Sequence, residues 1–266
     1  MPHGQLTDSR VLLTGATGGI GHAVAREFAT EGAELVVTGR RSDVLDVLAS
    51  ELGATAIAAD LSDAAQVARL AADSGPVDVL IANAGLPAGG HLLELSTTEL
   101  DRIVDVNLRA PMLLARHFAE GMLARGRGHI VFVGSIAGLL PAPMVSLYNA
   151  TKFGLRGFSL ALRHDLGSAG VGVSVVEPGF VRDAGMFADG GSSLPRGMRT
   201  VSPRQVARAV VRAVRDDVGE IVVAPLEVRL LARIGCVMPG LLAPLHRAMD
   251  AERLGAELGG GLRNKF

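Results

Sequence analysis

The segment SLYNATKFGL, Ser146–Leu155, brings together two residue types that the rest of the chain almost lacks. Tyr148 is the only tyrosine, and Lys152 is one of two lysines, the other being Lys265. In a helix, positions i and i+4 share one face, so the ammonium group can approach the phenol. A phenol titrates near ~10, and a nearby cation lowers that pKa, which suits a general acid or base. The spacing alone fits a surface pair on a long helix equally well.

Two further polar residues could join this pair. Ser135 follows the apolar run VFVG, thirteen residues before Tyr148, although serines are also common in turns. Val133 stands two residues before Ser135, so the G-x-S-x-G pattern of a hydrolase nucleophile is absent. Asn107 precedes Pro111 by four residues, and proline lacks the N–H that would bond the Asn107 carbonyl. That carbonyl is then free for another partner, or Asn107 is simply a solvated residue in a kinked helix.

The glycine-rich segment TGATGGIG, Thr14–Gly21, joins a predicted strand to a predicted helix. Its glycines allow a tight turn and a close approach of the backbone to a ligand. The helix N-terminus that follows offers free N–H groups and a positive dipole end to a pyrophosphate. The spacing is G-x-x-x-G-x-G and not G-x-G-x-x-G. The segment therefore predicts a dinucleotide site at the first βα turn.

The end of the second predicted strand indicates which dinucleotide binds. An NAD site has an acidic residue there, whereas this chain has VVTGRRS with Arg40 and Arg41. A guanidinium group can hold a 2′-phosphate with two hydrogen bonds. We therefore expect NADP(H) to be preferred over NAD(H), unless these arginines are solvated loop charges.

Short apolar runs alternate with segments of helical period along the chain. We expect strands at residues 10–15, 34–39, 54–60, 77–85, 128–135, 171–179 and 220–225. We expect helices at 22–32, 42–53 with Ser42 as the N-cap, 63–74, 98–125 with a kink at Pro111, 147–168 and 202–215. This alternation predicts an α/β fold: a doubly wound, seven-stranded, Rossmann-like parallel sheet with helices on both faces.

Length and composition limit the domain organisation and the class of partner. The chain has 266 residues, 48% of them hydrophobic, and shows no internal repeat, so we expect one domain over 1–266. Within it we expect a mobile substrate lid at 183–201 and a helical C-terminal extension at 226–266. A net charge of −1 and few aromatic residues argue against nucleic acid as a partner.

The cysteine, the histidines and the apolar runs argue against a disulfide-bonded, metal-binding or membrane-spanning protein. Cys236 is the only cysteine, so no internal disulfide can form and we expect a cytoplasmic protein. The first ten residues lack an apolar core and no uncharged apolar run is long enough to span a bilayer, so we expect neither a signal peptide nor a membrane span. The seven histidines lack metal-ligand spacing, so no metal site is predicted.

Taken together and in order, these motifs resemble the short-chain dehydrogenase/reductase family, as far as about Pro225. The motifs are TGATGGIG, ADL with Asp60, NAG at Asn83–Gly85, Asn107, Ser135, YNATK, and PG at Pro178–Gly179. Two positions depart from the family pattern. Ala82 stands where the family often has asparagine, and Asp183 stands where it often has threonine near the nicotinamide carboxamide.

The resemblance implies a role for each catalytic residue. Tyr148 would be the general acid or base, and Lys152 would assist it and bind the nicotinamide ribose. Ser135 would hold the substrate oxygen. The Asn107 carbonyl would bind a water that extends a proton relay to Lys152. The implied cofactor-binding residues are Gly15, Thr17, Gly18, Gly19, Ile20, Gly21, Arg40, Asp60, Leu61, Asn83, Ala84, Gly85, Tyr148, Lys152, Pro178, Gly179 and Val181.

The activity implied is an NADP-dependent oxidoreductase that interconverts a ketone and a secondary alcohol. An apolar substrate is expected because the flanking loops supply Leu139, Leu140, Met144, Phe180, Met186 and Phe187. We also expect a homo-oligomer, either a dimer or a tetramer. Two alternatives remain: an epimerase or dehydratase that retains its nicotinamide cofactor, and a non-enzymatic NADPH-binding protein.

Overall fold

A computed structural model describes residues 6–183 and 199–238 of the chain. The greater part of the predicted lid at 183–201 lies outside the described residues, together with Met186 and Phe187. The predicted extension at 226–266 is described only over its first part, which is helical. Among the described residues, no helix is both long and apolar enough to cross a membrane.

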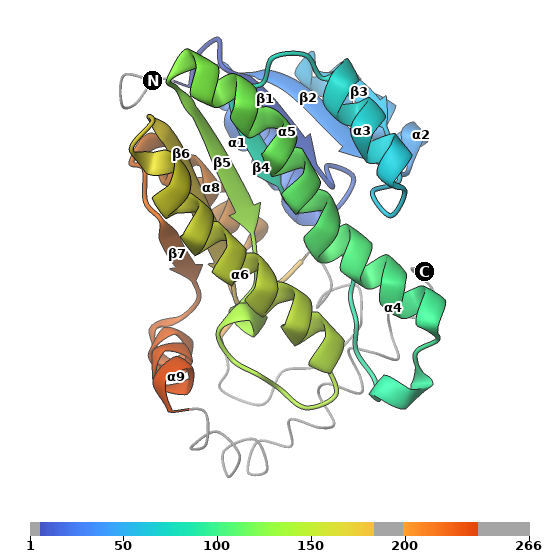
Figure 1. Cartoon of the computed structure of the whole chain (residues 1–266), viewed down its shortest axis with the longest axis vertical. Helices are drawn as coiled ribbons and strands as arrows, with labels where there is room; N and C mark the ends of the chain where they lie inside the picture. Colours follow the sequence, from blue (N-terminus) through green and yellow to red (C-terminus); the bar gives the residue numbers. More distant parts are fainter. Residues whose placement is uncertain (1–5, 184–198, 239–266) are drawn as a thin grey trace.

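The protein is built on the seven-stranded parallel sheet that the sequence predicted (Figure 1). The strand order is β3-β2-β1-β4-β5-β6-β7, which places the reversal of winding between β1 and β4. The strands are β1 (Arg10–Thr14), β2 (Glu34–Gly39), β3 (Thr55–Ala58), β4 (Val79–Ala82), β5 (Gly128–Val133), β6 (Val171–Pro178) and β7 (Glu220–Val223).

Helices cover both faces of the sheet. They are α1 (Gly19–Thr30), α2 (Ser42–Leu52), α3 (Ala64–Asp73), α4 (Thr97–Val104), α5 (Ala110–Arg125), α6 (Ser146–Gly167), α8 (Pro203–Arg215) and α9 (Leu226–Val237), with short turns η1 (Leu92–Glu94), η2 (Asp105–Arg109) and η3 (Ile136–Gly138). Helices α3, α5 and α6 pack on the front face in Figure 1, and α1 and α8 pack behind it.

The two layers are separated by the alternation of side chains along each strand. In β1, Leu12 packs into the core with α3, α5 and α6, whereas Val11 and Leu13 pack into the core with α1, α2 and α8. Both cores are largely aliphatic, and the strands are apolar on both faces, as expected for a parallel sheet. The sheet is therefore a rigid support for the loops at its edges.

Two helix predictions were wrong in detail. Arg41 and not Ser42 occupies the N-cap position of α2, and it makes no capping side-chain hydrogen bond. The expected single helix at 98–125 is divided into α4 and α5 by the π-helical turn η2, where the Ala110 N–H donates to the Asp105 carbonyl five residues back. Pro111 falls in the first turn of α5, where its missing N–H costs least.

All seven strands end at one edge of the sheet because they are parallel. This carboxyl edge lies toward the bottom of Figure 1, where β5 and β7 point and where η1 and α9 lie. The turn between β1 and α1 and the loops after β4, β5 and β6 meet there. Ser135 and the predicted cofactor-binding glycines lie in these segments or at the start of α1, whereas Asn107 lies in η2 and Tyr148 and Lys152 lie in α6.

Candidate active site

Helix α6 places Tyr148 and Lys152 on the same face, one turn apart. The Lys152 Nζ atom lies 5.7 Å from the centroid of the Tyr148 ring. Lys152 is only 3% exposed, and Tyr148 is half-buried against the core that contains α6. A surface pair would leave the ammonium in water, so the alternative of a solvated helical pair is wrong.

The buried ammonium of Lys152 points toward the end of β5. Its Nζ donates a hydrogen bond to the Val133 carbonyl at 3.1 Å. Burial lowers the pKa of Lys152 to about 8, and the negative charge of Glu177 opposes that shift. Lys152 thus exchanges its proton more easily than a solvated lysine does.

The predicted lowering of the Tyr148 pKa is wrong for this structure. Burial raises the pKa of Tyr148 above its ordinary value, and the charge of Glu177 adds to that shift. A hydrogen bond between the Ser135 and Tyr148 side chains acts in the opposite direction and is outweighed. The neutral phenol is therefore the stable form at neutral pH, and it is a proton donor.

Ser135 lies at the N-cap of η3, immediately beyond β5. Its Oγ atom accepts a hydrogen bond from the Ala137 N–H at 3.1 Å, which leaves the hydroxyl proton to be donated elsewhere. Because the Ser135 side chain is hydrogen bonded to Tyr148, the two hydroxyl groups lie together at the carboxyl edge.

Asn107 lies in the π-helical turn and is completely buried, so it is not a solvated residue. Its side chain accepts from the Leu86 N–H at 2.6 Å and donates to the Leu86 carbonyl at 2.9 Å. It also donates to Thr151 Oγ1 at 3.3 Å. Asn107 therefore ties α6 to the loop after β4, next to Lys152.

The glycine-rich turn forms an open cradle at the N-terminus of α1. Gly15 has φ +67°, and a Cβ there would lie 2.7 Å from the Ala84 Cα atom. Gly18 and Gly19 are exposed, and no side chain caps α1. The first N–H groups of the helix therefore face outward, which fits the pyrophosphate of a dinucleotide. Thr17 and Ile20, in the same turn, are half-buried.

The loop after β4 is joined to this cradle. The Asn83 side chain donates to the Thr14 and Gly15 carbonyls at 3.0 and 3.2 Å, and the Ala84 N–H donates to Thr14 Oγ1 at 3.0 Å. A Cβ on Gly85 would lie 3.6 Å from Lys152 Nζ. The consecutive residues Asn83–Gly85 thus connect the cradle to α6.

The ends of β2 and β3 meet beside the cradle. Arg40 is exposed at the end of β2, and Arg41 donates to the Thr17 carbonyl. Asp60 accepts hydrogen bonds from Ser62 and pairs with Arg102 at 3.0 Å. The Leu61 side chain is 8% exposed and packs in the core.

The end of β6 closes the site on its other side. The Gly179 N–H donates to the Val223 carbonyl at 2.9 Å, directly after Pro178. Val181 is buried and pairs with Val201. Asp183 adopts φ +64° with a 75% exposed side chain and pairs with Arg182 at 3.5 Å.

The family model for the short chain dehydrogenases matches residues 9–193, which include every residue predicted to be catalytic. The chain belongs to the short-chain dehydrogenase/reductase family. It is therefore an NAD(P)-dependent oxidoreductase of that class, and the resemblance on which the site was predicted is confirmed.

One relative of this dehydrogenase matches nearly its whole length, and another matches about two thirds of it. It is 35% identical over 256 residues to the ketoacyl reductase HetN of Nostoc sp. strain PCC 7120, covering 91% of this chain and 89% of the relative. It is 39% identical to the NADP-dependent 3-hydroxy acid dehydrogenase YdfG of Salmonella typhi over 180 residues, covering 64% and 72% of the two chains.

A solved structure supports the same assignment. The short-chain dehydrogenase of Sphingobium yanoikuyae, in complex with NADPH, superposes with a TM-score of 0.76 at 29% identity. The match covers 88% of this dehydrogenase and 95% of the other chain.

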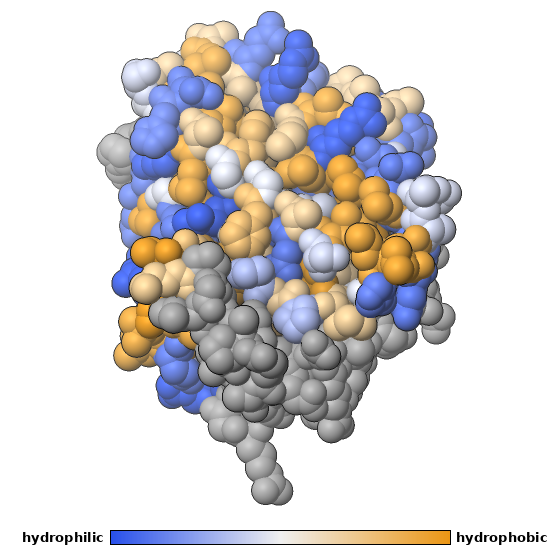
Figure 2. Space-filling view, turned by 60° about the horizontal axis from the view of Figure 1, so that its bottom comes forward, coloured by the Kyte–Doolittle hydropathy of each residue, from blue (hydrophilic) through white to orange (hydrophobic). Residues whose placement is uncertain are grey.

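The loop after Ser135 is rich in apolar residues and is held by contacts with other segments. Leu139 is buried, and its carbonyl accepts a weak hydrogen bond from Cys236 Sγ of α9 at 3.4 Å. The Met144 carbonyl accepts from the Gly90 N–H at 2.7 Å. Figure 2 turns this end of the molecule toward the reader and shows apolar residues gathered in patches on it.

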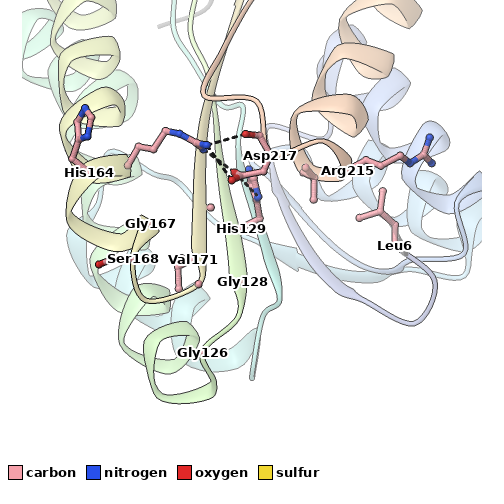
Figure 3. A pocket seen from close by; sticks show the side chains of 14 residues that line it. Leu6, Gly126, Gly128, His129, His164, Gly167, Ser168, Val171, Arg215 and Asp217 are labelled. Carbon is pink, nitrogen blue, oxygen red and sulfur yellow. Dashed lines mark hydrogen bonds and ion pairs between the residues drawn. The ribbon is translucent and has the colours of Figure 1, made fainter. Parts of the chain in front are cut away.

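A cavity of about 630 Å³ lies at the opposite, amino edge of the sheet, where β5 and β6 begin (Figure 3). Arg163 there donates to both Asp217 carboxylate oxygens, at 2.7 and 3.0 Å, and Arg215 pairs with Glu31. Its arginines are thus paired with carboxylates. The cavity contains none of the family's motif residues, so the dehydrogenase reaction does not take place there.

One residue beside Ser135, Glu177, was not predicted from the sequence. It is fully buried in β6, and one of its carboxylate oxygens accepts the Ser135 N–H. A carboxylate inside an otherwise apolar strand, VGVSVVEP, was the feature that could have revealed it. Within the described ranges, no group of His, Cys, Asp or Glu side chains is arranged to bind a metal ion.

Proposed function

We propose that this protein uses NADP(H) to interconvert an apolar ketone and its secondary alcohol, with Tyr148 as the proton donor and acceptor. The main support is one observation: the Tyr148 phenol is hydrogen bonded to the Ser135 side chain and lies beside the buried Lys152 ammonium, with 5.7 Å between Nζ and the ring centroid. A group that keeps its proton at neutral pH is suited to protonate the oxygen of a reduced carbonyl.

Bound NADPH would supply the hydride that reduces the carbonyl carbon. Ser135 donates a hydrogen bond to the substrate oxygen and holds it against Tyr148. Tyr148 transfers its proton to that oxygen as negative charge develops there. Lys152 stabilises the resulting phenolate, and the Asn107 region connects Lys152 to the proton supply. The same groups act in reverse order when an alcohol is oxidised.

The preference for NADP(H) rests on the end of β2. The exposed Arg40 and Arg41 follow Gly39, and no carboxylate occupies the position that would hold the ribose hydroxyls of NAD. The positive charge of Arg40 also acts on Asp60, so the two side chains lie near each other. One similar structure contains NADPH, and one relative is named as NADP-dependent.

The preference for an apolar substrate rests on the residues around the two hydroxyls. Leu139, Leu140, Met144 and Phe180 belong to the loops that flank Ser135 and the end of β6, and all four are buried or half-buried. The names of two relatives, a ketoacyl reductase and a 3-hydroxy acid dehydrogenase, describe the same pair of functional groups. A ketone with an apolar chain on one side fits these surroundings best.

The test is a spectrophotometric panel of ketones with NADPH and NADH, measured for wild type and Tyr148→Phe. We expect the phenylalanine variant to lose turnover by about 10³-fold or more, because the proton donor is removed, while calorimetry should show that NADPH still binds. Arg40→Ser should weaken NADPH binding and leave NADH binding unaffected. Wild-type turnover in Tyr148→Phe, or product formation without consumption of cofactor, would contradict the proposal.

A further inference from the structure

Glu177 is a buried charge that the proposed reaction does not use. It lies in β6 immediately before Pro178 and is completely inaccessible to solvent. Its Oε2 atom accepts the Ser135 N–H, whereas its Oε1 atom has no hydrogen-bond partner among the described residues. A buried carboxylate with an unsatisfied oxygen is unfavourable for folding, so its presence beside the catalytic serine calls for a reason in the site itself.

The segment Val133–Ser135 is held at both ends by charged side chains. Lys152 Nζ donates to the Val133 carbonyl at 3.1 Å, and Glu177 accepts the Ser135 N–H. Between them, the Gly134 N–H donates to the Val176 carbonyl at 2.8 Å. The orientation of the Ser135 hydroxyl therefore depends on Lys152 and Glu177 together.

Two glycines leave the space that the Glu177 carboxyl group fills. A Cβ on Gly134 would lie between 2.3 and 2.9 Å from the three heavy atoms of that group. A Cβ on Gly138 would lie 3.3 Å from its Oε1 atom and 2.9 Å from the Lys152 carbonyl oxygen. Side chains at these positions would displace the carboxylate, so the turn is shaped around it.

The charges near Glu177 come from two elements. Helix α6 contributes Lys152, Arg156 and the Tyr148 phenol, and β7 contributes Glu220. Arg156 is already paired with Glu220, with 2.5 Å between its Nε atom and Oε1. Lys152 is therefore the cation that Glu177 balances.

We propose that Glu177 is a positioning residue of the active site: its carboxylate fixes the turn that carries Ser135 and supplies the counter-charge that keeps Lys152 protonated beside Tyr148. The inference depends on the roles proposed above for Ser135, Lys152 and Tyr148. Burial raises the pKa of Glu177 to about 8, although the Ser135 N–H and the charge of Lys152 oppose that shift, so its negative charge is fully present only on the alkaline side of neutrality. There the charge favours the Lys152 ammonium and disfavours the Tyr148 phenolate. Without that charge, both groups should lose their protons at lower pH.

The composition of the chain allows a direct test by NMR. With only two lysines and one tyrosine, protein labelled with ¹³Cε-lysine gives two titrating resonances, which Lys265→Arg assigns. Glu177→Gln retains an oxygen acceptor for the Ser135 N–H but removes the charge. We expect the titration midpoint of Lys152 to fall by about one pH unit in this variant. Asp217→Asn, which removes a carboxylate at the other edge of the sheet, should leave it unchanged.

Turnover supplies the second measurement. The alkaline loss of ketone reduction should move to lower pH in Glu177→Gln, because both Lys152 and Tyr148 act in their protonated forms. A purely structural role for Glu177 would reduce the rate without moving this limb of the pH profile. Glu177→Asp keeps the charge on a shorter side chain, so it should restore the pH profile but not the full rate.

An unchanged Lys152 midpoint in Glu177→Gln would overturn the inference. If the glutamine variant does not fold, the aspartate variant decides. A wild-type rate in Glu177→Asp shows that the position of the carboxylate does not matter and overturns the inference, whereas a reduced rate with a wild-type Lys152 titration supports it. A wild-type protein that reduces no carbonyl compound contradicts the proposed function alone, because the NMR titration does not require turnover.

Discussion

At both edges of the sheet, charged side chains connect α6 to neighbouring segments. The charges at the two edges differ in how deeply they are buried and how completely they are paired. At the amino edge, Arg163 and Asp217 form a two-point pair and are 30% and 40% exposed. At the carboxyl edge, Lys152 and Glu177 are buried, and Glu177 keeps an unsatisfied oxygen. Paired, hydrated charges stabilise a fold modestly, whereas buried and incompletely satisfied charges have shifted pKa values that suit proton transfer.

The largest expected difference between the edges is in catalysis. Lys152→Met should reduce kcat by about 10³-fold, because it removes the ammonium that stabilises the Tyr148 phenolate. Arg163→Met, the matched change at the amino edge of the same helix, should keep kcat within about threefold and lower the free energy of unfolding by about 1 kcal/mol. Steady-state kinetics and urea unfolding of both variants measure this. A comparable loss of kcat in Arg163→Met would show that the two edges do not differ in their importance for catalysis.

The free energy of unfolding should depend on pH through a histidine at the amino edge of the sheet. Burial lowers the pKa of His129 to about 4. The imidazole therefore stays neutral in the folded protein at pH values below 6.5, where the unfolded chain binds a proton. Stability from this group is present above pH 6.5 and is lost as the pH falls toward 4. Between pH 7 and pH 5 the loss should be about 2 kcal/mol.

His129→Gln supplies the control for that loss. The amide can still bond Ser174, the partner of the His129 Nε2 atom at 2.8 Å, but it does not titrate. Urea unfolding at the two pH values should show a drop that is smaller by about 2 kcal/mol in the variant. Equal drops in wild type and variant would show that His129 is not held neutral by the fold.

A smaller difference is expected between alanine substitutions at two glycines with similar φ angles. Gly15 has φ +67° and contacts the Ala84 backbone, whereas Gly126 has φ +63° and open space, with nothing within 4 Å of where a Cβ would lie. Gly126→Ala should cost about 1 kcal/mol of stability from the left-handed backbone alone, and Gly15→Ala about 2 kcal/mol. Only Gly15→Ala should also weaken NADPH binding, as measured by calorimetry. Equal effects on both properties would show that the cradle is not a distinct site.

The fold could be predicted from the sequence because each strand is a short apolar run between helical segments with polar faces. The catalytic roles were predicted from the resemblance to the family, since only Ser135 directly follows a strand, whereas Tyr148 and Lys152 lie in α6 and Asn107 in η2. The N-cap of α2 was predicted at Ser42 but lies at Arg41. The cap position depends on the local backbone geometry, which the residue type at position 42 does not determine. The pKa of Tyr148 was predicted in the wrong direction because burial, which outweighs the hydrogen bond with Ser135, is a tertiary property.

Glu177 and Asn107 show the remaining limit. Asn107 was a predicted site residue and Glu177 is a carboxylate in an apolar strand, but nothing in the sequence near either residue indicated which distant backbone segment its side chain contacts. Asn107 bonds Leu86, 21 residues away, and Glu177 bonds Ser135, 42 residues away. Contacts of that range are set by the packing of whole elements, and local patterns do not contain them.

The π-helical turn at Asp105–Arg109 also restricts how the length of this chain can change over evolution. The turn holds one residue more than an α-helical turn, and each residue rotates a helix by about 100°. Deleting a single residue here would restore a regular helix and swing the Asn107 amide away from Leu86. Insertions and deletions should therefore accumulate in the surface connections, while the interval between Ser96 and Arg125 keeps a constant length.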